Sequence, residues 1–132
     1  MLKVILSVFL VVPSFAGVVH IDDATKKKNK SGIEVRFLAT PKEQKTKSAF
    51  MAHMTIPAGA KVPVHKDKSE EYIYVLEGEG MVWINGGLFP VKAGSSVFMP
   101  ADAEVSFING PKETKVIQFF APLGAEKRYE KW

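Results

Sequence analysis

The sequence contains no cysteine among its 132 residues. Disulfide bonds, thiolate metal ligands and a thiol nucleophile are therefore excluded, and the fold must be held by packing and hydrogen bonds. A long hydrophobic run is also missing. The longest one, from Val4 to Val12, is about half of the ~20 residues that a membrane span needs. No window has a convincing helical period, and no segment is of low complexity.

The first sixteen residues have the three parts of a secretory signal. Lys3 supplies a positive charge, the run from Val4 to Val12 is apolar, and Ser14 and Ala16 place small residues before a cleavage point. A membrane anchor is the alternative, but the run is short for one. We therefore predict a signal peptide over residues 1–16, a periplasmic or secreted mature chain, and no stable membrane anchor after cleavage.

Positive charge is concentrated near the start of the mature chain. The net charge is +4, and the excess of lysine lies between His20 and Ser48. This stretch is polar and lacks the interleaved aromatic residues typical of a nucleic-acid-binding face, so no nucleic-acid partner is expected. We predict that residues 17–32 form an extended, basic N-terminal arm, solvated and mobile. A weaker alternative is that lysines 26–47 contact an acidic glycan or a membrane surface.

The rest of the chain is patterned as short strands. Its composition, 46% hydrophobic and 24% charged, is that of a globular domain. Runs of alternating or β-branched residues recur every 8–12 residues or so, with turn residues between them, which favours an all-β barrel or sandwich. The dipeptide Asn85-Gly86 is a strong hairpin signal. The expected strands are 33–37, 49–56, 62–65, 72–76, 81–84, 88–91, 96–99, 104–108 and 114–120.

The charged tail, residues 124–132, carries no strand pattern. It either forms a short helix or stays loose, and Trp132 is a candidate to cover one end of a barrel.

One stretch carries residues with metal-binding chemistry at a regular spacing. His65 and Asp67 lie two apart, so an extended chain presents them on the same face. A short turn then lets the next strand bring Glu71 back beside them. The three groups can therefore converge inside a barrel. Imidazole and carboxylate groups together suit a divalent metal such as Mn²⁺ or Fe²⁺.

The spacing of Gly59, His65, Glu71 and Gly78 resembles the first motif of the cupin family. Asp67 stands where that motif has a second histidine. The resemblance implies a double-stranded jelly-roll barrel, expected here over residues 33–123.

The second cupin motif is present in outline. Gly94, Pro100 and Asn109 fit it, but Asp102 replaces a glycine and Val105 replaces a histidine. In the family that histidine is the fourth metal ligand, and valine cannot coordinate a metal. The resemblance therefore implies a partial site for a divalent metal on His65, Asp67 and Glu71, with the fourth ligand lost.

Three further residues are candidates for a substrate pocket. His53 and Gln118 are polar residues within strands that are otherwise mostly apolar, and a buried amide must find hydrogen-bond partners. Tyr72 begins the strand after the metal motif, as a pocket or a core residue. Alternation alone does not decide whether His53 points inward, because both faces of its strand are largely apolar.

Two alternative functions are compatible with the sequence and with its resemblance to the cupin family. The first is an exported protein that binds a small organic molecule with a divalent metal, and that performs metal-assisted oxygenase, isomerase or lyase chemistry if it is an enzyme. The second is a metal-free binding or sensing module for a sugar or organic acid, in which Val105 marks a decayed site. The resemblance also implies a homodimer, with the extended segment 17–33 as a candidate contact.

Overall fold

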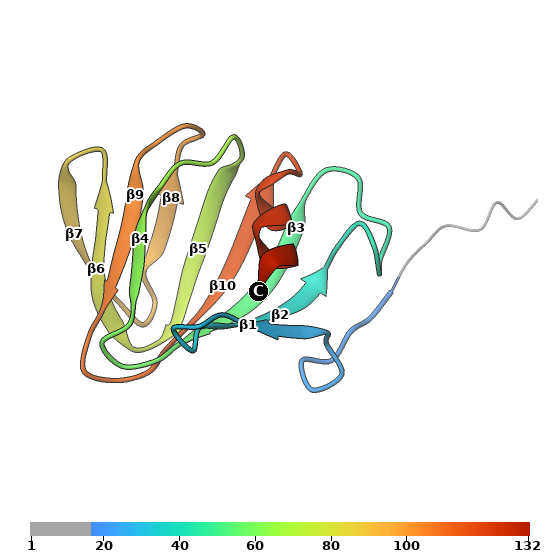
Figure 1. The fold of residues 1–132 in the computed structure, drawn as a ribbon, viewed down its shortest axis with the longest axis horizontal. Coiled ribbons are helices and arrows are strands. Elements are labelled where there is room, and N and C mark those ends of the chain that lie inside the picture. Colours follow the sequence, from blue (N-terminus) through green and yellow to red (C-terminus); the bar gives the residue numbers. More distant parts are fainter. Residues whose placement is uncertain (1–16) are drawn as a thin grey trace, which may run out of the picture.

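The computed structural model describes residues 17–132, so the predicted signal peptide lies outside the described part. Ten strands form two antiparallel sheets, one of six strands in the order β1-β2-β3-β10-β5-β8 and one of four in the order β4-β9-β6-β7 (Figure 1). The strands are β1 Lys26–Lys28, β2 Glu34–Ala39, β3 Phe50–Ile56, β4 Lys61–His65, β5 Glu70–Glu77, β6 Glu79–Ile84, β7 Gly87–Lys92, β8 Ser96–Met99, β9 Val105–Asn109 and β10 Thr114–Ala121.

The sheets form the expected all-β jelly roll, and each predicted strand coincides with one of β2 to β10 within two residues. The Asn85-Gly86 hairpin joins β6 to β7, with φ angles of 46° and 87° at these two residues. Both angles are positive, as a tight two-residue hairpin turn of this kind requires, and asparagine and glycine adopt them most easily.

The core lies between the two sheets and follows the period of two. Along β3, Phe50, Ala52, Met54 and Ile56 are all buried. On the neighbouring strand β10, alternate residues from Thr114 to Phe120 are buried in the same way. Because successive side chains of a strand point to opposite faces, each of these sets shares the face turned to the other sheet.

The basic arm is more ordered than the sequence predicted. Lys26–Lys28 forms β1, which pairs with β2, and the amide of Phe37 donates to the carbonyl of Thr25 at 2.9 Å. Lysines suit this position because β1 is the edge of the six-stranded sheet, where charged side chains reach water and discourage pairing with other chains.

The charged tail forms a short helix. It is the 3₁₀ helix η1, Ala125–Lys131, and it packs against the six-stranded sheet through Tyr129, which is 1% exposed. The Tyr129 ring stacks on Phe50, with ring centroids 5.8 Å apart, and Trp132 packs edge-on against it. Within residues 17–132, no helix is long and apolar enough to cross a membrane.

Two of the turn glycines differ in what surrounds them. Gly78 and Gly86 both have positive φ angles, 88° and 87°. A Cβ on Gly78 would lie 2.7 Å from the carbonyl oxygen of Glu113, whereas one on Gly86 would have no atom within 4 Å. Glycine is therefore needed at 86 for its backbone freedom, and at 78 also because the chain of β10 passes close by.

We expect Gly78→Ala to destabilise the protein much more than Gly86→Ala. The second substitution adds only backbone strain, about 1–2 kcal/mol. The first adds the same strain and a steric clash, for a total of about 3 kcal/mol or more. Urea unfolding of the two variants measures the difference, and equal losses would show that the close approach of Glu113 is relieved at no cost.

Candidate metal centre

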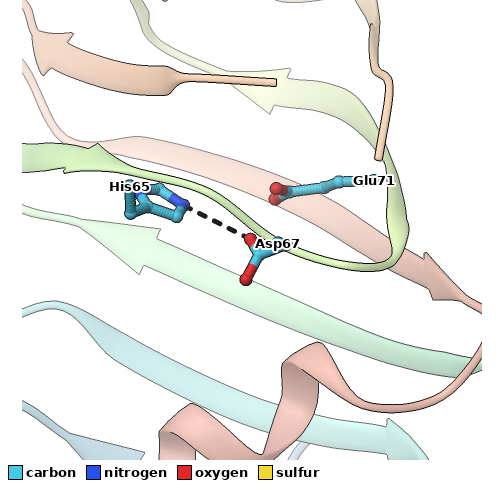
Figure 2. Close-up of side chains that lie close together, drawn as sticks. All are labelled: His65, Asp67 and Glu71. Atoms are coloured by element: carbon cyan, nitrogen blue, oxygen red, sulfur yellow. Dashed lines mark ion pairs between the residues drawn. The ribbon is translucent and has the colours of Figure 1, made fainter. Parts of the chain in front are cut away.

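The structure brings His65, Asp67 and Glu71 together at one place. His65 ends β4, Asp67 lies in the following loop, and Glu71 is the second residue of β5 (Figure 2). One ligand atom from each residue can be chosen so that all three atoms lie within 4.8 Å of one another. The side chains of His65 and Asp67 are 27% and 16% exposed, and Glu71 is buried. The turn between β4 and β5 thus joins the three groups as the spacing predicted.

The imidazole of His65 is held in the tautomer that suits a metal ligand. Its Nδ1 lies 2.8 Å from the carbonyl oxygen of Pro63. A carbonyl oxygen only accepts hydrogen bonds, so Nδ1 carries the proton and Nε2 keeps its lone pair. Nε2 points toward Asp67, with 3.5 Å between it and Oδ2. Orientation of a ligating histidine by a backbone carbonyl is a common feature of metal sites.

Two atoms of this group are buried without hydrogen-bond partners. They are His65 Nε2 and Asp67 Oδ2. Buried polar atoms usually have a partner, and an exception calls for an explanation. Nε2 has a free lone pair that faces Asp67, while Oδ2 of Asp67 forms an ion pair with Arg128. One imidazole and two carboxylates are a donor set suited to Mn²⁺ or Fe²⁺, so the residues present fit a divalent metal.

The carboxyl group of Glu71 is strongly perturbed by its surroundings. Burial raises its pKa to about 7, opposed by a hydrogen bond from Gln118 and by the positive charge of Arg128. The bond from Gln118 Nε2 to Glu71 Oε1 is 2.6 Å long. Burial disfavours the charged form of a carboxyl group, whereas hydrogen bonds and nearby cations favour it. Glu71 is therefore placed to change its charge near neutral pH.

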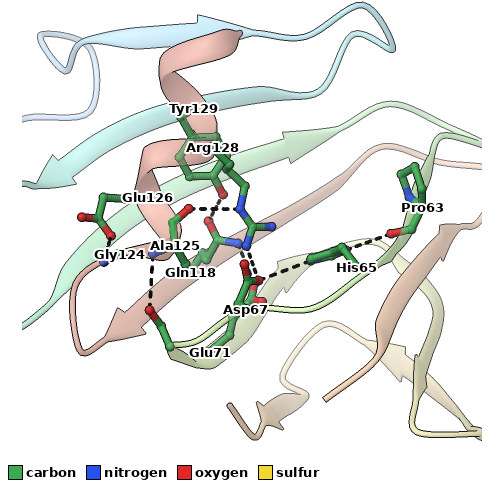
Figure 3. Close-up of polar contacts among 11 residues, drawn as sticks. Pro63, His65, Asp67, Glu71, Gln118, Gly124, Ala125, Glu126, Arg128 and Tyr129 are labelled. Carbon is green, nitrogen blue, oxygen red and sulfur yellow. Dashed lines mark hydrogen bonds and ion pairs between the residues drawn. The ribbon is translucent and has the colours of Figure 1, made fainter. Parts of the chain in front are cut away.

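Gln118 connects Glu71 to the C-terminal helix. It is 3% exposed, and its carbonyl oxygen accepts a hydrogen bond from the hydroxyl group of Tyr129 (Figure 3). Burial raises the pKa of Tyr129, so the phenol stays protonated and able to donate. Of the three predicted pocket residues, Gln118 is the one that lines the cavity next to the metal motif.

The cavity occupies the space between the sheets and measures about 360 Å³. Its polar lining includes His65, Glu71, Gln118 and Arg128, while most of the remaining wall is aliphatic or aromatic. The apolar wall includes Met54, Ile73, Val75, Val82, Val97, Val105, Phe107, Val116 and Trp132. A cavity with an apolar wall and few polar groups is typical of a small-molecule site.

His53 and Tyr72 lie elsewhere, in contrast to the prediction that they line the pocket. His53 is buried on the face of β3 opposite Ala52 and Met54, and burial lowers its pKa, helped by the charges of Lys115 and Arg36. The reason is the period of two along β3, which places Met54 and Ile56 on the cavity side and His53 on the other face.

Tyr72 is 42% exposed on the outer face of β5. Its hydroxyl group donates to Glu70, and its ring packs against Phe98, with ring centroids 5.2 Å apart. Because Glu71 faces the cavity, Tyr72 must face away from it.

The positions of the second motif have clear structural roles. Val105 pairs with His65 across β9 and β4 and lines the cavity, but offers no ligand. Asp102, in place of a glycine, adopts a positive φ of 63°, and its amide donates to the Asp67 carbonyl. The buried side-chain amide of Asn109 donates to three backbone carbonyls, those of Ile56, Pro57 and Lys112.

Arg128 is a site residue that the sequence analysis did not single out. From η1 it reaches Asp67, with which it forms an ion pair (Figure 3). Its rarity was a faint signal, because the chain has only one other arginine, Arg36. Nothing local in the charged tail indicated that its side chain would enter the site.

We expect Glu71 to make the metal-free protein less stable as the pH rises from about 4.5 to 7. The folded state, with the raised pKa, holds a proton there that the unfolded state has lost, so unfolding becomes easier with rising pH. Relative to Glu71→Gln, the wild type should lose about 3 kcal/mol over this window. Urea unfolding of both proteins in chelator measures it, and parallel pH profiles would contradict the raised pKa.

Comparison with known proteins agrees with this architecture. The family of cupin domains matches residues 52–120. CurC, a polyketide synthase protein of Streptomyces cyaneus, is 32% identical over 96 residues, which are 71% of this chain and 62% of CurC. The chain thus spans less than two thirds of the length of CurC. An oxalate-binding protein of Thermotoga maritima is 33% identical over 81 residues, covering 61% of this chain and 67% of the relative.

Solved structures show the same fold. A predicted oxalate decarboxylase from Thermotoga maritima superposes with a TM-score of 0.72 and 27% identity, over 81% of this chain and all of that one. An RmlC-like cupin from Shewanella frigidimarina gives a TM-score of 0.75 at 20% identity, over 85% and 96% of the two chains. With the family match over more than half of its length and the jelly roll in place, the chain belongs to the cupin family.

Proposed function

We propose that this protein binds a divalent metal, Mn²⁺ or Fe²⁺, through His65, Asp67 and Glu71, and holds a small organic molecule in the adjoining cavity. The observation that carries the proposal is that one ligand atom from each of the three residues lies within 4.8 Å of the other two, while the buried Nε2 of His65 has no hydrogen-bond partner. When bound, the metal would supply Lewis-acid chemistry for substrate oxygens.

The cavity supports the second half of the proposal. Its volume of about 360 Å³ suits a small organic molecule, and its apolar wall would contact the body of that molecule. His65, Glu71, Gln118 and Arg128 form one connected polar group with Asp67, so a ligand would be oriented with its oxygens toward this part of the wall. The names of two relatives, an oxalate-binding protein and a predicted oxalate decarboxylase, favour an organic acid.

A metal-free binding module is the second candidate. Two observations favour it: Val105 takes the position of the fourth ligand, and the guanidinium of Arg128 already gives Asp67 a positive partner. The two candidates share the cavity and differ in whether the three ligands hold a metal.

We also propose, from the sequence alone, that the chain is exported and that it forms a homodimer.

Metal content separates the two candidates. We expect the untagged protein to bind about one Mn²⁺ or Fe²⁺ per chain, and His65→Ala to lose it, because the variant keeps only two carboxylate ligands. Elemental analysis and isothermal titration with Mn²⁺ measure this. His20→Ala is the control, since His20 is exposed and far from the motif in sequence. A wild type that stays metal-free under all loading conditions would favour the binding module.

Restoring the missing ligand tests the site from the opposite direction. Val105 pairs with His65 and lines the cavity, so Val105→His would add an imidazole beside the three ligands. We expect the affinity for Mn²⁺ to rise by at least about tenfold, equivalent to ~1.4 kcal/mol. The same titration measures it. An unchanged affinity in a folded variant would mean that the metal is not held beside position 105.

A further inference from the structure

Arg128 is held rigidly against the metal motif. Its Nε donates to the carbonyl oxygen of Ala125 at 3.1 Å, and its guanidinium carbon lies 5.2 Å from the centroid of the Phe120 ring. Its Nη2 atom is buried and forms the ion pair with Oδ2 of Asp67. An arginine fixed on an aromatic ring can bind an anion with little further loss of side-chain freedom.

The helix that carries Arg128 is fixed from several sides. Tyr129 is buried, stacks on Phe50 and donates its hydroxyl hydrogen to Gln118. Trp132 contacts the Tyr129 ring and lines the cavity. These contacts hold η1, and the guanidinium that it carries, beside the cavity. Figure 3 shows it entering the site from η1, opposite the loop that carries Asp67.

The formal charges of the site with a divalent metal bound do not balance. A divalent metal and Arg128 together carry three positive charges, and ionised Asp67 and Glu71 carry two negative ones. His65 is neutral when its Nε2 is a ligand. One positive charge would remain in a partly buried site with an apolar wall, where an uncompensated charge is costly. A ligand with a single negative charge would balance it.

We propose that Arg128 anchors the ligand by an anionic group, a carboxylate, and that the rest of this ligand is apolar. The inference rests on the proposed function, because the charge count includes the metal. A carboxylate has two oxygens in one plane, which match the planar fork of a guanidinium. The apolar wall of the cavity, with Val82, Val97 and Phe107, would take the body of the molecule.

Matched acids and amides test the anchor. Benzoate and benzamide, and hexanoate and hexanamide, differ mainly in charge within each pair. Isothermal titration of the full chain with each compound, with and without Mn²⁺, gives the ratio of acid to amide affinity. We expect the wild type to prefer the acids by at least about tenfold, as a charge-assisted bond to arginine would give.

Two variants and a control test whether Arg128 causes the preference for acids over amides. Arg128→Gln should bring the ratio to about one, and Arg128→Lys, which keeps the charge but not the fork, should give an intermediate value. Lys127→Gln has the same charge change on the same helix, but Lys127 is exposed, so its ratio should match the wild type. Should Arg128→Gln fail to fold, a ratio reduced in Arg128→Lys still supports the anchor.

The outcomes separate this inference from the proposed function. If Arg128→Gln keeps the preference for acids, or if the wild type has none, the anchor is overturned. A structural ion pair alone would alter the unfolding temperature of the ligand-free variant and leave the ratio unchanged, which also overturns it. If the wild type binds no Mn²⁺ but its preference for acids disappears in Arg128→Gln, the anchor is supported and the metal proposal fails.

Discussion

Gln118 connects Glu71 of the metal motif to Tyr129 of the C-terminal helix η1, and the position of this helix depends on the connection. Its amide has a donor and an acceptor, so it can give a hydrogen bond to Glu71 and take one from Tyr129. All three side chains are buried. Leaving any of them without its partner would cost the desolvation of a polar group, about 1–3 kcal/mol. This chain of hydrogen bonds keeps η1 against the sheet, and with it Arg128, which pairs with Asp67.

The apolar surroundings of Glu71, Asp67 and Arg128 strengthen the electrostatic interactions among these groups. The cavity wall is mostly apolar, so charges at its polar end are poorly screened by water. Burial raises the pKa of Glu71 to about 7, while Asp67 lies beside the guanidinium of Arg128. The two carboxyl groups are therefore in different environments although both belong to one motif. A site of this kind favours ligands and ions that balance its charge, which is a basis for selectivity in a small protein.

Much of the fold could be read from local patterns. The period of two in β3, and the Asn85-Gly86 dipeptide, predict strands and a hairpin, because side-chain direction and backbone angles are set by neighbouring residues. The same reasoning placed His65 and Asp67 together. It did not assign His53 to the outer face, since both faces of that strand are apolar in sequence. It also treated the lysines of β1 as a mobile arm, although an edge strand accommodates them.

By itself, the sequence determined the strands, their turns and the approach of His65, Asp67 and Glu71, because these depend on residues close together in the chain. The tertiary structure alone decided that Gln118 meets Glu71, that Tyr129 covers the pair, and that Arg128 enters the site. Those contacts join β5, β10 and η1, which are distant in the chain. Their formation depends on how the sheets pack and close around the cavity, which no local pattern of residues specifies.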